Sequence, residues 1–109
     1  MKEAAVAAFS RRDYAAAVDL LSRAISLDNS NHVFWSNRSA AYVALEEFDS
    51  ALADADECVR LQPGWAKGHA RRGGALFRLG RLGPARAALE KALSLDGETV
   101  QARSRLSLL

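Results

Sequence analysis

Apolar residues recur along this chain at steps of three and four, which is the spacing of one face of an amphipathic α-helix. Residues 14–28 show the pattern first, with Ala17 and Leu21 on the apolar face. The same pattern returns over residues 48–61 and 82–95. The sequence therefore predicts a long helix in each of these three segments.

A second helix is expected before each of the three, over residues 2–11, 33–45 and 67–79. Asn, Asp, Pro and Gly stand at the junctions 28–31, 62–64 and 96–97, and these residue types commonly end helices. Pro84 falls in the first turn of its helix, where its missing N–H costs little. The chain is thus predicted to be all-α and built from helix pairs.

The helix pairs repeat every 34 residues without insertion. Small residues share columns, and so do large apolar ones. The small columns are Ala17, Ala51 and Ala85; Ala24, Cys58 and Ala92; Ala7, Ala41 and Ala75; and Ala5, Ser39 and Gly73. The large apolar columns are Tyr14, Phe48 and Leu82; Ile25, Val59 and Leu93; and Leu27, Leu61 and Leu95.

Small residues at a helix contact let two backbones approach closely, and one helix pair cannot bury its own apolar stripe. The copies are therefore expected to stack. We predict a single domain over residues 1–109 with repeats at about 1–31, 32–65 and 66–99. Residues 98–109 are expected to form a capping helix over the last repeat.

The pattern resembles the tetratricopeptide repeat (TPR), a 34-residue helix–turn–helix. The matching residues are Trp35, Tyr42, Phe48, Ala51, Cys58 and Pro63 in the middle repeat and Gly73, Ala85 and Ala92 in the third. The resemblance implies a right-handed superhelix of three repeats whose first helices line a concave surface. Such surfaces bind other molecules and carry no chemistry of their own.

Composition and charge exclude several further classes of function. The chain has 109 residues and a net charge of +2, with 50% hydrophobic, 26% charged and 7% aromatic residues. No apolar run reaches about 18 residues and no signal-peptide core is present, so we expect a cytoplasmic protein without membrane spans. Cys58 is expected to be a packing residue, and the isolated His32 and His69 give no metal site. No catalytic set or cofactor motif is visible, so neither an enzyme nor a small-molecule substrate is expected.

A basic stretch stands out against this near-neutral background. No Asp or Glu occurs from Cys58 to Leu89, whereas the same stretch contains Arg60, Lys67, Arg71, Arg72, Arg78, Arg81 and Arg86. A segment of one charge sign indicates an acidic ligand. The competing interpretation is a solvated basic face, which is the commoner meaning of such runs.

Spacing favours a ligand site. Lys67 and Arg71 are four residues apart and share a helix face. Asn37 occupies the column of Arg71 one repeat earlier, and Lys2 lies on the first helix of the first repeat. We expect these four side chains to converge in the groove, where cations and an amide suit a pair of carboxylates.

This set resembles the dicarboxylate clamp of co-chaperone TPR domains. Segments 31–42 and 65–73 are similar to the first TPR domain of the heat-shock-organising (Sti-type) proteins. The resemblance implies that Lys2, Asn37, Lys67 and Arg71 grip the C-terminal Glu-Glu-Val-Asp of heat-shock protein 70 or 90. The family's second clamp Asn corresponds to Val6, which cannot form a hydrogen bond.

The remaining groove positions are secondary. Ala40 and Gly74 share a small column that leaves room for a ligand backbone. Phe77 offers an apolar contact to the ligand or, equally, a core contact between repeats. Arg78 faces either the ligand or solvent.

Two other functions remain open at this point. One is a generic TPR scaffold that binds a different peptide or helix. The other is a nucleic-acid module, which is disfavoured because the net charge is small and no aromatic stacking platform accompanies the arginines. Preference between the two chaperones, and the oligomeric state, do not follow from the sequence.

Overall fold

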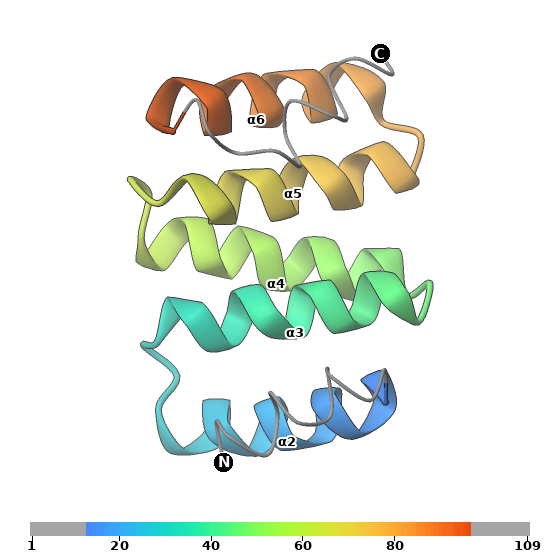
Figure 1. Cartoon of the computed structure of the whole chain (residues 1–109), viewed down its shortest axis with the longest axis vertical. Helices are drawn as coiled ribbons and strands as arrows, with labels where there is room; N and C mark the ends of the chain where they lie inside the picture. Colours follow the sequence, from blue (N-terminus) through green and yellow to red (C-terminus); the bar gives the residue numbers. More distant parts are fainter. Residues whose placement is uncertain (1–12, 97–109) are drawn as a thin grey trace.

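The computed structural model describes residues 13–96, which form five α-helices and no strand (Figure 1). The helices are α2 (Tyr14–Leu27), α3 (His32–Ala44), α4 (Phe48–Leu61), α5 (Ala66–Arg78) and α6 (Leu82–Leu95). Each agrees with a predicted helix to within one residue at either end, so the all-α prediction is confirmed. The predicted helices at 2–11 and 98–109 lie outside the described residues.

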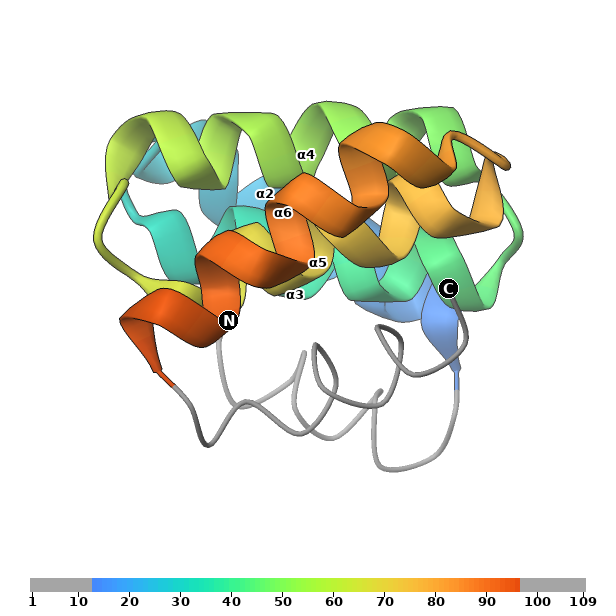
Figure 2. The same ribbon diagram turned by 90° about the horizontal axis from the view of Figure 1, so that it is seen from above.

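The helices stack in chain order, and each contacts the next along the chain. In addition, α3 contacts α5 directly, although α4 separates the two along the chain. Seen from above, α4 lies to one side of α3 and α5 (Figure 2). The first helices of the second and third repeats are therefore direct neighbours, which is the arrangement that a shared groove requires.

The small columns lie at the closest helix contacts. Ala17, Ala51 and Ala85 are all 0% exposed. At Gly73 a Cβ atom would lie 2.5 Å from Cδ2 of Leu89, so α5 and α6 approach closely because this position has no side chain. These contacts confirm the interpretation of the small columns as packing positions.

The large apolar columns are less uniform than the sequence pattern implies. Leu27 and Leu95, each the last residue of its helix, are 80% and 38% exposed, although both belong to the predicted apolar face. Leu82 is 52% exposed, whereas Phe48, one repeat earlier, is covered by the guanidinium of Arg78. Of the helices within residues 13–96, none combines the length and apolarity needed to cross a bilayer.

Two inter-helix turns repeat the same backbone conformation 34 residues apart. Glu46 follows α3 with φ of 61°, and Gly80 follows α5 with φ of 77°. In both turns the next N–H donates to a carbonyl five residues back, from Glu47 to Tyr42 and from Arg81 to Leu76. This left-handed termination favours glycine, and only the second turn has it.

We expect Glu46→Gly to raise the free energy of unfolding by about 0.5–1 kcal/mol. The left-handed conformation strains a residue with a Cβ, and the greater freedom of glycine in the unfolded chain offsets part of the gain. The reciprocal change, Gly80→Ala, should destabilise by a similar amount, because no atom lies within 4 Å of the new Cβ and the backbone penalty acts alone. Urea unfolding followed by circular dichroism measures both. Equal stabilities for the parent and both variants would contradict this account.

Candidate functional site

Arg71 reaches from α5 to the turn of α3 that carries Asn37. Its Nε donates a hydrogen bond to Oγ of Ser36 at 3.4 Å. Ser36 is fully buried, and Arg71 and Asn37 are half-buried. Arg71 thus contacts the residue that directly precedes Asn37 in the sequence.

Lys67 lies one helical turn before Arg71 and is exposed. Within residues 13–96 neither Lys67 nor Asn37 has a hydrogen-bond or ion-pair partner. Their polar groups are therefore available to a ligand on this part of the chain. Convergence of these groups with Arg71 on one ligand stays a prediction.

The other predicted groove residues differ in their surroundings. Lys2 and Val6 lie outside the described residues. Ala40 is half-buried on α3 and Gly74 is buried on α5. Ala40 is thus on the helix of Asn37, and Gly74 is on the helix of Lys67 and Arg71.

Phe77 and Arg78 have partners within the fold. Phe77 is half-buried and packs against a core cluster that contains Leu76 and Ala85. The guanidinium of Arg78 lies 4.7 Å from the ring centroid of Phe48 on α4. These contacts correspond to the packing alternative for Phe77, and they give Arg78 a cation–π partner. A ligand contact by either side chain stays a prediction.

The basic stretch is partly neutralised by acids on α4. Arg72 pairs with Asp56 at 2.7 Å, and Arg60 pairs with Glu57 one turn away. These exposed pairs contribute little stability, but they reduce the positive charge available to a polyanion. The pair of Arg60 and Glu57 has the three-residue spacing of one helix face, whereas the pair of Arg72 and Asp56 forms across the α4–α5 contact and has no such signal in the sequence.

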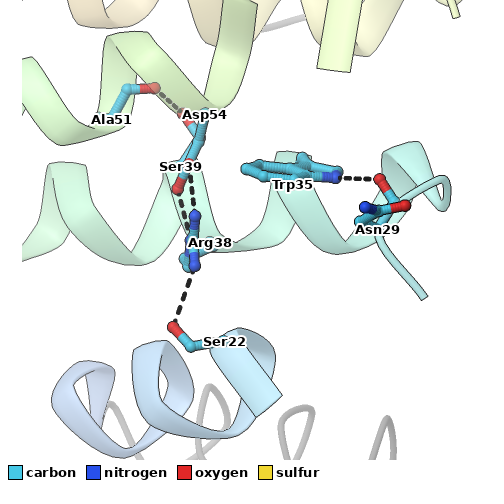
Figure 3. Close-up of polar contacts among 7 residues, drawn as sticks. All are labelled: Ser22, Asn29, Trp35, Arg38, Ser39, Ala51 and Asp54. Atoms are coloured by element: carbon cyan, nitrogen blue, oxygen red, sulfur yellow. Dashed lines mark hydrogen bonds and ion pairs between the residues drawn. The ribbon is translucent and has the colours of Figure 1, made fainter. Parts of the chain in front are cut away.

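Beside Asn37 lies a polar network that the sequence analysis did not identify (Figure 3). Arg38 makes two hydrogen bonds to Asp54 on α4, both of 2.8 Å, and Nη1 donates to Oγ of Ser22 on α2 at 3.1 Å. The hydrogen bonds to Asp54 raise the pKa of Arg38, against the opposing effect of its burial. The signal for this pair was Asp54 itself, an acid on the apolar face of α4 between Ala51 and Cys58.

The network fixes the rotation of α3 about its axis. The guanidinium of Arg38 lies 5.1 Å from the ring centroid of Trp35, whose Nε1 donates to the carbonyl of Asn29. Oγ of the buried Ser39 donates to the carbonyl of Ala51 at 2.8 Å. With these neighbours held, the orientation of Asn37 on the same helix follows.

Cys58 is on α4, in the column that it shares with Ala24 and Ala92. It is fully buried, and burial raises the pKa of its thiol to about 11, although the nearby positive charge of Arg71 lowers it. A thiol in such surroundings is a packing group, as the small column predicts.

Both histidines make structural contacts. The ring of His32 packs edge-on against Trp65, with centroids 4.6 Å apart. Nε2 of His69 donates to the carbonyl of Pro63 at 2.7 Å. The two side chains therefore fasten the start of α3 and the start of α5 to the loop before α5.

Comparison with known proteins agrees with this fold. The sequence model described as "Tetratricopeptide repeat" matches residues 66–99. The heat shock protein sti1 homolog of Schizosaccharomyces pombe is 47% identical over 95 residues, which are 87% of this chain and 16% of that protein. The chain therefore spans about one sixth of the length of that curated relative. The expected similarity to Sti-type proteins is confirmed.

Two solved structures are similar over nearly the whole chain. The first TPR domain of Spaghetti (RPAP3), bound to the HSP90 peptide SRMEEVD, has a TM-score of 0.93 at 31% identity, over 98% of this chain and 85% of that one. The second TPR domain of human RPAP3, in complex with the HSP70 peptide SGPTIEEVD, has a TM-score of 0.92 at 30% identity, over 98% and 89%. The 34-residue period, the stacked helix pairs and these matches agree, and the chain belongs to the tetratricopeptide repeat family.

Proposed function

We propose that this domain is a co-chaperone adaptor that binds the C-terminal Glu-Glu-Val-Asp tail of heat-shock protein 70 or 90. The binding residues are Lys2, Asn37, Lys67 and Arg71, which act together as a carboxylate clamp. The observation that carries the proposal is the reach of Arg71 from α5 to α3, where its Nε contacts Ser36 beside Asn37. The domain recognises a chain end in the cytoplasm and performs no reaction.

The chemistry of the groups fits the end of an acidic peptide. A terminal Asp presents two carboxylates, its side chain and the α-carboxylate. The guanidinium of Arg71 donates several hydrogen bonds in a fixed plane, and the ammonium of Lys67 adds a compact charge one turn away. The amide of Asn37 donates to a carboxylate oxygen without adding charge.

The similar domains support this choice of ligand. The two RPAP3 domains are bound to peptides that end in EEVD, and the curated relative is named a sti1 homolog. The pairing of Arg60 and Arg72 with acids on α4 weakens the nucleic-acid alternative, because it removes charge from the stretch that suggested it.

Val6 stands where the clamp family has a second Asn. A missing hydrogen bond to a charged group costs about 1.5–3 kcal/mol. We therefore expect an affinity roughly ten- to a hundredfold below that of a clamp with both amides. A Val6→Asn variant should recover part of this difference.

Arg71→Ala should weaken binding of a Glu-Glu-Val-Asp peptide by about 1.5–3 kcal/mol, because charge-assisted hydrogen bonds to a carboxylate are lost. Arg72→Ala is the matched control. It removes the adjacent arginine, which is paired with Asp56, and should leave the affinity unchanged. Isothermal titration calorimetry with peptides from both chaperones measures these changes.

The same titrations test the function itself. Binding must disappear when the C-terminus of the peptide is amidated, since amidation removes one of the two carboxylates. If the free-acid and amidated peptides bind the unsubstituted domain equally, the clamp is excluded and a generic scaffold is favoured. Binding to nucleic acid that falls steeply with salt would instead favour the basic-surface alternative.

A further inference from the structure

One face of α5 carries both of the exposed residues of that helix, and both are cations. We propose that one of them, Arg78, forms an anionic subsite beyond the clamp, where its guanidinium pairs with the first glutamate of a bound Glu-Glu-Val-Asp tail. The inference rests on the proposed function and deepens it, because it assigns a partner to that glutamate and a direction to the peptide.

The exposed face follows from the spacing of its residues. Four residues succeed one another at intervals of four, three and four, namely Lys67, Arg71, Gly74 and Arg78. Such intervals place side chains on one face of an α-helix. Lys67 and Arg78 are exposed, whereas every other residue of α5 is buried or half-buried. These four residues therefore form a basic strip that continues along α5 beyond the two clamp cations.

The charge of Arg78 is not balanced within the fold. Among residues 13–96 this side chain has neither an ion pair nor a hydrogen bond. Arg72, by contrast, is outside the basic strip and pairs with Asp56. On α3, the four positions one repeat before the strip are uncharged, namely Val33, Asn37, Ala40 and Ala44. An anion that binds at Arg78 thus displaces no acid of the described chain.

An aromatic ring limits the positions that the guanidinium can take. Its Cζ lies 4.7 Å from the ring centroid of Phe48, the first residue of α4. The attraction is between the positive charge and the π face, so the guanidinium, with five N–H groups, keeps the capacity to donate to a carboxylate. Because the side chain is already partly ordered, it loses less entropy when it binds.

Helix geometry gives the position of Arg78 relative to the clamp. It is seven residues after Arg71, which corresponds to about 10 Å along the axis of α5. An extended peptide advances about 3.3 Å per residue, so the peptide residue at Arg78 is about three residues before the one held at Arg71. In Glu-Glu-Val-Asp, the residue three before the terminal Asp is the first Glu.

The basic strip also indicates the direction of the peptide. Towards the N-terminus of α5 the strip ends at Lys67, because the helix begins at Ala66. In the other direction, Gly74 adds no side chain between Arg71 and Arg78. A tail whose end is held by Lys67 and Arg71 therefore extends along α5 towards Arg78.

Variants that preserve side-chain length test the charge of Arg78. Arg78→Met removes the cation but can still cover Phe48, and Arg72→Met is the matched control from the same helix. The probe is acetylated Ala-Ala-Glu-Glu-Val-Asp with a free C-terminus. We expect Arg78→Met to weaken binding about 2- to 5-fold, the effect of an exposed ion pair, and Arg72→Met to change it by less than about 1.5-fold. Gln in place of the first Glu should weaken binding to the parent domain but not to Arg78→Met.

An exchange of charges identifies the partner of Arg78. A peptide with Lys in place of the first Glu should bind the parent domain roughly tenfold more weakly, since an attractive pair becomes a repulsive one. Arg78→Glu should reverse this preference. Lys in place of the second Glu should weaken binding to both domains by a similar factor, because adjacent side chains of an extended peptide point to opposite sides.

Isothermal titration calorimetry at about 0.15 M salt, where distant charges are screened, measures these affinities. Circular dichroism checks that the variants are folded. If Arg78→Glu still prefers Glu over Lys at the first position, the subsite is refuted while tail binding stands. A reversal at the second position instead of the first would also overturn the proposal. Failure of the parent domain to bind the unsubstituted probe would reject the proposed function, and this inference with it.

Discussion

Arg38→Ala should lower the free energy of unfolding by about 3–5 kcal/mol. The side chains of Arg38 and Asp54 are 17% and 5% exposed, so this substitution leaves a carboxylate buried without its cation. It also removes the hydrogen bond to Ser22 and the stacking on Trp35. Because Ser22 is on α2 and Asp54 on α4, the first described helix loses an attachment to the second repeat. Urea unfolding followed by circular dichroism measures the effect.

Two controls distinguish the effect of burial of this ion pair from the effect of removing a charge. Arg23 and Asp19 form another Arg–Asp pair on α2, but both side chains are 63% exposed, so Arg23→Ala should change stability by less than about 0.5 kcal/mol. Replacing both buried partners, with Arg38→Met and Asp54→Leu together, should restore most of the lost stability, since no unpaired charge remains. A similar loss for Arg38→Ala and Arg23→Ala would show that burial is not the cause.

The helices of the second and third repeats were predictable because their signals repeat. Ala51 and Ala85, with Ala17 before them, occupy one column, and each is fully buried because the same helix contact is made in each copy. A register established in one repeat therefore fixes it in the next. This redundancy explains why predicted and observed helix ends differ by no more than one residue.

The polar pairs were not predictable in the same way, because a period describes columns and not the contacts between them. The other two copies of the repeat have Leu20 and Ala88 at the position of Asp54. The repeat pattern therefore does not predict a partner for this carboxylate. Its partner Arg38 lies on another helix and is identified only once the packing is known. The pairing of Arg72 on α5 with Asp56 on α4 was missed for the same reason.

The candidate site contains features that the repeat predicts and a contact that it does not predict. The shared face of Lys67 and Arg71 follows from their four-residue spacing, and the neighbouring position of Asn37 follows from the repeat. The contact of Arg71 with Ser36 does not follow, because it depends on the side-chain rotamer and on how closely α5 approaches α3. Sequence columns locate such a site, while the orientation of its charged groups comes from the packing.

The contact of α5 with α6 provides the second large expected effect. Leu89 is 0% exposed and packs against Ala70 and Ala92. Leu89→Ala should lower the free energy of unfolding by about 2–5 kcal/mol, through lost burial and the cavity left among small neighbours that have little volume to fill it. Leu93→Ala, on the same helix but only half-buried, should cost less. An equal loss for the two would contradict a packing origin.

A double substitution, with a larger residue at position 73 and a smaller one at position 89, tests the same packing. A Cβ at Gly73 would lie 2.5 and 2.6 Å from Cδ2 and Cγ of Leu89, so Gly73→Ala in the parent domain introduces overpacking of about 1–3 kcal/mol. The better helix propensity of alanine, about 1 kcal/mol, offsets only part of this cost. In the Leu89→Ala background the new methyl enters the vacated space, so the same substitution should stabilise. This reversal of sign, measured by urea unfolding of the four proteins, follows only if Gly73 is small because Leu89 fills its side-chain position. Additive effects of the two substitutions would rule that explanation out.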